Sequence, residues 1–241
     1  MRHQGWLVML PILMMSFSLP GGCGTGESVS PAGDSRSMAL PEPAYDSDTS
    51  VEKALLERRS IRDYRREALT LKQVGQLLWS AQGVTSTGGM RTAPSAGALY
   101  PLEVYAVIGN VEGVAPGVYK YRPDAHELVK VLDGDWRKAL SQAALNQECV
   151  SQGAIDIVIT AVYERTTGKY GERGIRYVHM EAGHAAQNIY LQAFSLELGT
   201  VTIGAFDDDG VKRVLRLPDN EEPLYIMPVG KTGDGGGRGD I

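Results

Sequence analysis

The sequence predicts an α+β domain, and three observations support that class. Residues 155–162 form an almost continuous β-branched run, which is typical of a central, buried strand. Residues 172–198 predict a long helix, and small residues in a helix let another helix approach closely. Four such residues gather near its middle: Ala182, Gly183, Ala185 and Ala186. No regular βαβ alternation links the elements, so we expect a mixed arrangement with the long helix at the centre of the fold or at a subunit interface.

The other elements follow from capping signals and hydrophobic patterns. Thr70 and Gln73 form a capping box, and apolar residues at helical spacing continue until Gly83 ends the helix. Further strands are predicted over residues 102–108, 118–121, 128–132, 201–203 and 224–229. The second and third of these strands form a hairpin, and residues 135–145 form another helix.

Composition excludes several classes of protein. The chain has 241 residues, with 29 acidic against 24 basic side chains, and it lacks the basic surplus that a dedicated nucleic-acid binder needs. Two cysteines are too few for a disulfide framework or a four-cysteine metal site. His179 and His184 are separated by about 140° around a helix, so they cannot share a metal on one face. We therefore predict no metal site.

The two ends of the chain are predicted to lie outside the folded domain. Residues 1–23 have a short basic start, an apolar run and small residues before Cys23, which together resemble a secretory signal with a bacterial lipobox. This pattern predicts an exported lipoprotein, anchored to the cell envelope through Cys23; the alternative is an ordinary cleaved signal. Residues 24–50 then form a flexible tether, 51–232 the domain and 233–241 a flexible tail. Cys149 would be a small buried apolar residue.

Three segments have the chemistry of an anion or flat-ligand site. Arg58, Arg59 and Ser60 offer charged forks and a hydroxyl, which suit a phosphate monoester. The segment 92–101 is a loop of small residues between prolines, through which backbone groups can approach a flat ligand. A glycine turn at residues 204–205 offers free backbone N–H groups. The same loop also resembles a nucleophile elbow, but Ala93 replaces its first glycine.

Taken together, these segments resemble the FMN-dependent nitroreductase family, and specifically its SagB-type branch, which includes azoline dehydrogenases. The resemblance runs from residue 51 to residue 231 and includes the stretch Gly183–Asn188. It implies a nitroreductase-like fold, with a central, mostly antiparallel sheet flanked by helices. It also implies non-covalently bound FMN and a two-fold homodimer whose interface forms the flavin sites.

The resemblance assigns roles to individual residues. Arg58, Arg59 and Ser60 would contact the phosphate and ribityl chain, and Lys231 would add a basic group there. The isoalloxazine ring would be lined by four residues of the loop: Pro94, Ser95, Ala96 and Gly97. Gly204 and Ala205 would present backbone groups to the ring. Such donors stabilise the negative charge of a reduced flavin.

Lys169 and Tyr170 resemble the Lys-Tyr pair that azoline dehydrogenases use beside the flavin. Dehydrogenation requires a base that removes a proton while hydride leaves, and either a buried lysine or a tyrosine can serve. The alternative is that these residues belong to a solvated turn.

The function predicted from these features is that of an FMN-dependent oxidoreductase. It would transfer hydride between flavin and a small or peptide-derived substrate, as a dehydrogenase. An alternative is an envelope-anchored lipoprotein that binds flavin or another ligand without turnover. A third is a serine hydrolase at Ser95.

Overall fold

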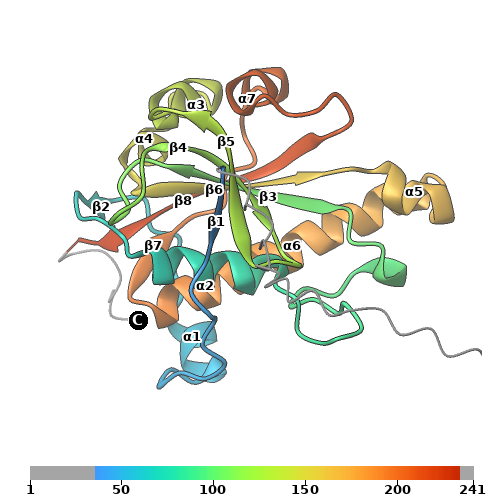
Figure 1. Cartoon of the computed structure of the whole chain (residues 1–241), viewed down its shortest axis with the longest axis horizontal. Helices are drawn as coiled ribbons and strands as arrows, with labels where there is room; N and C mark the ends of the chain where they lie inside the picture. The colour runs from blue at the N-terminus through green and yellow to red at the C-terminus, as the bar shows by residue number, and fades with distance from the viewer. Residues whose placement is uncertain (1–35, 234–241) are drawn as a thin grey trace, which may run out of the picture. The chain divides into compact units, whose positions relative to one another are not determined.

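The computed structural model describes residues 36–233, which contain eight strands and seven α-helices (Figure 1). The strands are β1 (Ser37–Ala39), β2 (Tyr64–Arg65), β3 (Leu102–Ile108), β4 (Gly117–Arg122), β5 (Glu127–Asp133), β6 (Ile155–Ala161), β7 (Leu198–Thr200) and β8 (Glu222–Thr232). The helices are α1 (Val51–Glu57), α2 (Leu71–Gln82), α3 (Arg137–Ala143), α4 (Glu148–Gln152), α5 (Glu164–Tyr170), α6 (Arg173–Ser195) and α7 (Asp208–Leu215). A short 3₁₀ turn spans Ala96–Ala98.

The strands form one sheet in the order β1-β5-β4-β3-β6-β8-β2, with β7 also paired to β8. Every pairing between these strands is antiparallel. All seven residues of β6 are buried, and the strand lies between β3 and β8, as its β-branched run predicts. The predicted α+β class with a mostly antiparallel sheet is confirmed.

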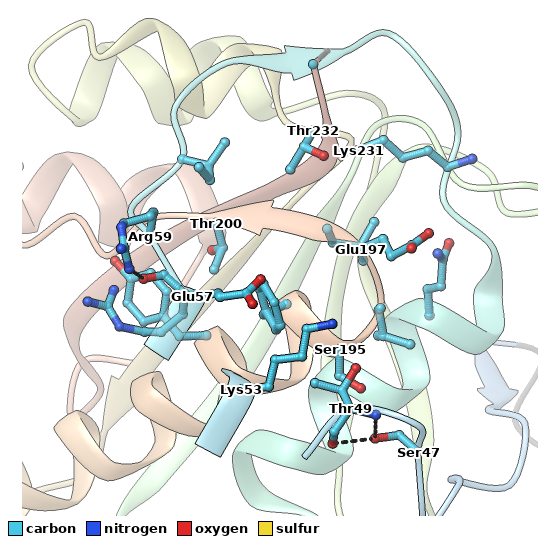
Figure 2. Close-up of a pocket in the computed structure, with 18 of the residues that line it drawn as sticks. Ser47, Thr49, Lys53, Glu57, Arg59, Ser195, Glu197, Thr200, Lys231 and Thr232 are labelled. Atoms are coloured by element: carbon cyan, nitrogen blue, oxygen red, sulfur yellow. Dashed lines mark hydrogen bonds between the residues drawn. The ribbon is translucent and has the colours of Figure 1, made fainter. Parts of the chain in front are cut away.

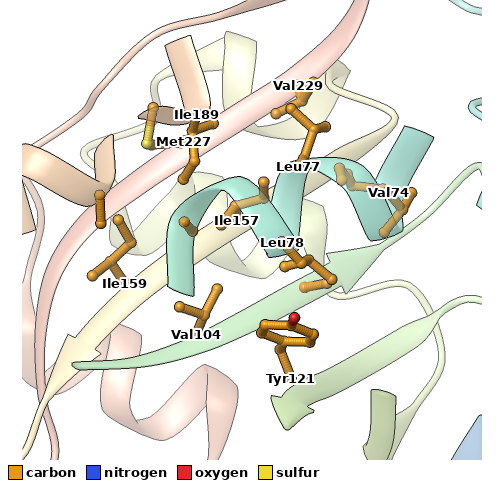
Figure 3. Packing of buried hydrophobic residues seen from close by; sticks show 14 of the residues in the cluster. Val74, Leu77, Leu78, Val104, Tyr121, Ile157, Ile159, Ile189, Met227 and Val229 are labelled. Atoms are coloured by element: carbon orange, nitrogen blue, oxygen red, sulfur yellow. The ribbon is translucent and has the colours of Figure 1, made fainter. Parts of the chain in front are cut away.

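Successive strand residues point to opposite sides of the sheet, so the sheet has two apolar faces, and helices cover both of them. On one face, β6 presents Ile155, Ile157 and Ile159 to a core that α2 and α6 complete (Figure 3). On the other face, Val158 packs in a second core with residues of α3, α4 and α7. Cys149 is a free, buried member of this second core, as predicted.

The long helix α6 crosses the first face next to α2 (Figure 1). Its small residues Ala182, Ala185 and Ala186 are buried in the core, so the close helix packing that they predict is confirmed. The capping box at Thr70 is also present. Its hydroxyl accepts the Gln73 N–H at 3.2 Å, and Gln73 Oε1 accepts the Thr70 N–H at 3.0 Å.

The structure corrects the predicted tether. Residues 37–39 form β1 at the edge of the sheet, and the Leu40 side chain is buried in the core. The Gln76 side chain accepts the Ala44 N–H at 2.8 Å and donates to the Ala44 carbonyl at 3.0 Å. The folded domain therefore begins well before Val51.

One further prediction needs correction. The strand predicted at 201–203 lies three residues earlier, as β7, and Ile203 makes only an isolated bridge to Ile226. Lys169 and Tyr170, for which a solvated turn was the alternative, lie in helix α5.

Residues 1–35 and 234–241 lie outside the described residues, so the predicted signal segment, the lipobox-like Cys23 and nearly all of the tail are not covered. Within residues 36–233, no helix is long and apolar enough to cross a membrane.

Candidate active site

A cavity of about 1210 Å³ is lined by residues from α1, β2, α2, α6, β7 and β8 and from neighbouring segments (Figure 2). Five cationic side chains line it: Lys53, Arg58, Arg59, Arg65 and Lys231. Its acidic lining residues are Asp48, Glu57, Glu67 and Glu197. The structure therefore brings Arg58, Arg59 and Lys231, which were predicted to hold one phosphate, to the same cavity.

The end of α1 directs the arginine segment across this cavity. Ser50 begins the helix by accepting the Lys53 N–H at 3.1 Å, and the helix ends at Arg58, whose N–H donates to the Ala54 carbonyl at 2.9 Å. The chain then leaves the helix, and the Ile61 N–H donates to the Thr200 carbonyl at 2.9 Å. Residues 58–60 are thus held at one end by helix α1 and at the other by the hydrogen bond to β7.

Hydrogen bonds and ion pairs orient the basic side chains. The Arg59 guanidinium donates to the carbonyls of Leu56 and Arg58, each at 2.9 Å. The Arg58 guanidinium lies over the Tyr190 ring, 5.2 Å from its centroid. Lys231 Nζ is 3.3 Å from Glu67 Oε2, in an exposed pair that is expected to add little stability. A bound anion can therefore recruit these cations at small cost.

Ser60, Gly204 and Ala205 do not line this cavity. Ser60 is exposed, and its hydroxyl lies 3.1 Å from the Tyr190 hydroxyl. Gly204 and Ala205 form an exposed turn in which the Ala205 carbonyl accepts from Gln147 Nε2 at 3.0 Å.

The loop at residues 94–100 contacts α5. Gly97 has φ +65°, and a Cβ atom added there would lie 2.8 Å from the Tyr170 hydroxyl and 3.0 Å from Lys169 Nζ. Ala98 and Tyr100 also have positive φ, 54° and 45°, which is strained backbone of the kind that clusters at functional sites. The structure thus brings the predicted ring-binding loop and the predicted catalytic pair together.

Lys169 is exposed and Tyr170 is half-buried, so the burial proposed for the lysine is not present in the protomer. Ser95, also half-buried, accepts the Tyr100 N–H on its hydroxyl at 2.9 Å. This bond closes the loop beneath the Lys169–Tyr170 pair.

A polar network that runs from the surface to the buried Glu221 fixes α5 to the sheet. Arg165 donates to the Tyr100 carbonyl at 3.1 Å and forms an ion pair with Glu103. Lys120 Nζ then bridges Glu103, at 3.2 Å, and Glu221, at 2.8 Å. Because Arg165 holds both the end of the loop and the first turn of α5, the network sets the position of Lys169 and Tyr170 over Gly97.

Glu181 is a candidate residue that sequence reasoning did not identify. It lies on α6, is only 3% exposed, and is near Ser95, Gln82 and Arg91. Burial raises the pKa of Glu181 to about 7, because desolvation outweighs the opposing influence of the nearby Ser95, Arg91 and Gln82 side chains. The available sequence signal was a carboxylate on the face of the helix that carries the buried alanines.

Comparison with known proteins identifies the family. Residues 55–231 match the nitroreductase family model. The chain belongs to the nitroreductase family. It is 47% identical over 199 residues to the protein MJ1384 of Methanocaldococcus jannaschii, which is classed as a nitroreductase, and the match covers 83% of this chain and 98% of that protein.

Other similar proteins are less close in sequence than MJ1384. A crystal structure of a protein from Ralstonia eutropha JMP134, also classed as a nitroreductase, matches with TM-score 0.73 and 30% identity, over 83% of this chain and 90% of that one. A chain of the Escherichia coli microcin synthetase McbBCD complex with truncated pro-MccB17 matches with TM-score 0.66 and 26% identity, over 82% and 79%. The FMN reductase (NADPH) of Bacillus subtilis is 25% identical over 198 residues, 76% of this chain and 66% of that protein.

Proposed function

We propose that the protein is an FMN-dependent oxidoreductase that transfers hydride between flavin and a small or peptide-derived substrate, acting as a dehydrogenase. The observation that carries this proposal is the position of Lys169 and Tyr170 directly over Gly97, in a loop of small residues. The relatives support it, since one is named an FMN reductase and another belongs to a microcin synthetase complex with truncated pro-MccB17 bound.

The residues present fit FMN. Arg58, Arg59 and Lys231 at one cavity supply charge-assisted donors for a phosphate monoester. Gly97 has no side chain, and the position that its Cβ atom would take lies 2.8 Å from the Tyr170 hydroxyl and 3.0 Å from Lys169 Nζ, so both groups reach the backbone of the predicted ring-binding loop. When bound, FMN supplies a hydride acceptor. The chain itself would supply the proton acceptor, at Lys169 Nζ or the Tyr170 hydroxyl.

The absorption spectrum of the purified protein without residues 1–23 tests this function. We expect two flavin bands and release of FMN on denaturation. A colourless protein that cannot be reconstituted with FMN would overturn the proposal.

Replacing Arg58 with alanine is expected to weaken FMN binding about 10- to 100-fold, because a hydrogen bond to a charged group contributes about 1.5–3 kcal/mol. Titration of flavin-free protein with FMN measures the change. The matched control is Arg122→Ala, since Arg122 is an exposed arginine whose only ion pair is with Glu127 among the described residues. Equal affinities of the Arg58 variant and the wild type would remove Arg58 from the phosphate site.

We further propose a homodimer in which two protomers complete each flavin site. Within one protomer, Gly97 and Lys169 do not line the cavity that Arg58 and Lys231 share. Large apolar side chains on α1 and α6 are exposed: Leu55 53%, Leu56 62%, Ile175 44% and Met180 51%. An interface over these helices would bury them.

Replacing Met180 with aspartate is therefore expected to give monomers that retain little FMN, because a charge at an apolar interface is costly. Sedimentation analysis and flavin content measure the two effects. Val131→Asp is the control, since Val131 is an exposed apolar residue, 39% accessible, on β5. A Met180→Asp dimer with full flavin content would contradict this interface.

A further inference from the structure

We propose that Tyr190, on the face of α6 that lines the cavity, is a positioning residue for the phosphate end of the cofactor. It would join the segment 58–60 to the segment 200–202 and so hold both in place before FMN binds. This inference rests on the proposed function and adds to it a residue that contributes no charge of its own.

The hydroxyl of Tyr190 bridges two separate segments. Its oxygen accepts the Thr202 N–H at 2.8 Å, and it lies 3.1 Å from the Ser60 hydroxyl. Because the oxygen already accepts from Thr202, the phenolic hydrogen can be donated to Ser60 Oγ. The hydrogen of the Ser60 hydroxyl is then available to an anion.

The ring of Tyr190 contacts the Arg58 guanidinium. The Arg58 guanidinium lies 5.2 Å from the ring centroid, which is within the range of a cation–π interaction. This contact restricts a long side chain that would otherwise lose conformational entropy when it binds an anion. Tyr190 therefore contacts both the arginine and the serine of the predicted phosphate site.

Backbone hydrogen bonds and strand pairing connect segments 58–60 and 200–202 to the strand that carries Lys231. The Ile61 N–H donates to the Thr200 carbonyl at 2.9 Å, directly after Ser60. Strand β7 pairs with β8, and in that register Leu198 lies opposite Lys231. A loss of the Tyr190 hydroxyl would loosen these connections on the side of Ser60 and Thr202, at a distance from the ring-binding loop.

The test compares FMN with riboflavin, which lacks the phosphate. Flavin-free wild-type protein, Tyr190→Phe and Tyr119→Phe are titrated with each flavin. Tyr119, on β4, is the control, because its hydroxyl makes a hydrogen bond to the Ala115 carbonyl at 2.7 Å and the residue does not line the cavity. Amide hydrogen exchange at Thr202 in the flavin-free proteins provides a second measurement.

We expect Tyr190→Phe to bind FMN about 3- to 10-fold more weakly, with riboflavin affinity changed less than about 2-fold, and to exchange the Thr202 amide faster. Tyr119→Phe should match the wild type in its affinity for FMN, its affinity for riboflavin and the exchange rate of the Thr202 amide. Two results would overturn the role of Tyr190 while leaving the proposed function intact. One is that Tyr190→Phe loses affinity for FMN and riboflavin equally. The other is that the wild type binds FMN and Tyr190→Phe binds it with the same affinity. Absence of FMN binding by the wild type would overturn the proposed function together with this inference.

Discussion

The variant Lys169→Ala is expected to oxidise a thiazoline-containing peptide about 10²- to 10⁴-fold more slowly than the wild type, while FMN stays bound. The reason is that oxidation of a carbon–heteroatom ring removes a proton as well as a hydride. Lys169 Nζ lies over Gly97, where the substrate would meet the ring-binding loop. Formation of the aromatic product, followed by mass spectrometry, measures the rate.

Contacts within the pair support a shared role for its two residues. Lys169 Nζ lies 5.4 Å from the centroid of the Tyr170 ring, and that ring packs edge-on against Tyr177 at 5.2 Å. Tyr170→Phe keeps this packing and removes only the hydroxyl. A loss of rate in Lys169→Ala but not in Tyr170→Phe would identify the lysine as the base.

The matched control for Lys169→Ala is Lys72→Ala, because Lys72 is an exposed lysine on α2. Its rate and flavin content should equal those of the wild type. Wild-type turnover by Lys169→Ala would show that another group accepts the proton. If the wild type leaves the thiazoline peptide unchanged, this substrate class is wrong whatever the role of the lysine.

Much of the fold could be predicted because its elements carry local signals. The capping box at Thr70, the hairpin of β4 and β5, and the apolar run of β6 each depend on neighbouring residues alone. Strand β1 could not be found in this way. Its three residues are held by backbone pairing with β5, and the sequence around them lacks an apolar period.

In the candidate site, too, residues within local motifs could be predicted and residues that depend on tertiary contacts could not. Motif order in the chain indicated Arg58, Gly97, Lys169 and Lys231, and the structure brings Arg58 to Lys231 and Gly97 to Lys169. Tyr190 and Glu181 were missed because both lie on a helix whose pattern indicates packing. Whether such a side chain packs or positions a ligand-binding group depends on tertiary contacts such as the Tyr190–Thr202 hydrogen bond.

Asp156 on β6 predicts an unusual dependence of stability on pH. It is completely buried, and neither carboxylate oxygen has a hydrogen-bond partner among the described residues. Burial raises the pKa of Asp156 well above its usual range, which the nearby Arg137 only partly opposes. Tyr64 and Cys149 are close enough for the charge of Asp156 to raise their own pKa values.

The sign of the effect follows from proton linkage. Between the unfolded pKa of about 3.9 and the higher folded pKa, the folded state holds a proton that the unfolded state has lost. The contribution of Asp156 to the free energy of unfolding is therefore complete below about pH 4. It falls as pH rises, by up to about 1.4 kcal/mol per pH unit, until the folded carboxyl ionises.

Asp156→Asn replaces the titratable carboxyl group with a neutral amide of similar size. The free energy of unfolding of the variant minus that of the wild type is expected to rise between pH 4 and pH 6, by up to about 3 kcal/mol. Urea unfolding at fixed protein concentration, with flavin removed, measures it at each pH. Asp133→Asn is the control, since the Asp133 side chain is 88% exposed and its pair with Lys130 should contribute little. A difference that does not change with pH would mean that Asp156 is ionised in the folded protein, with its charge balanced by Arg137.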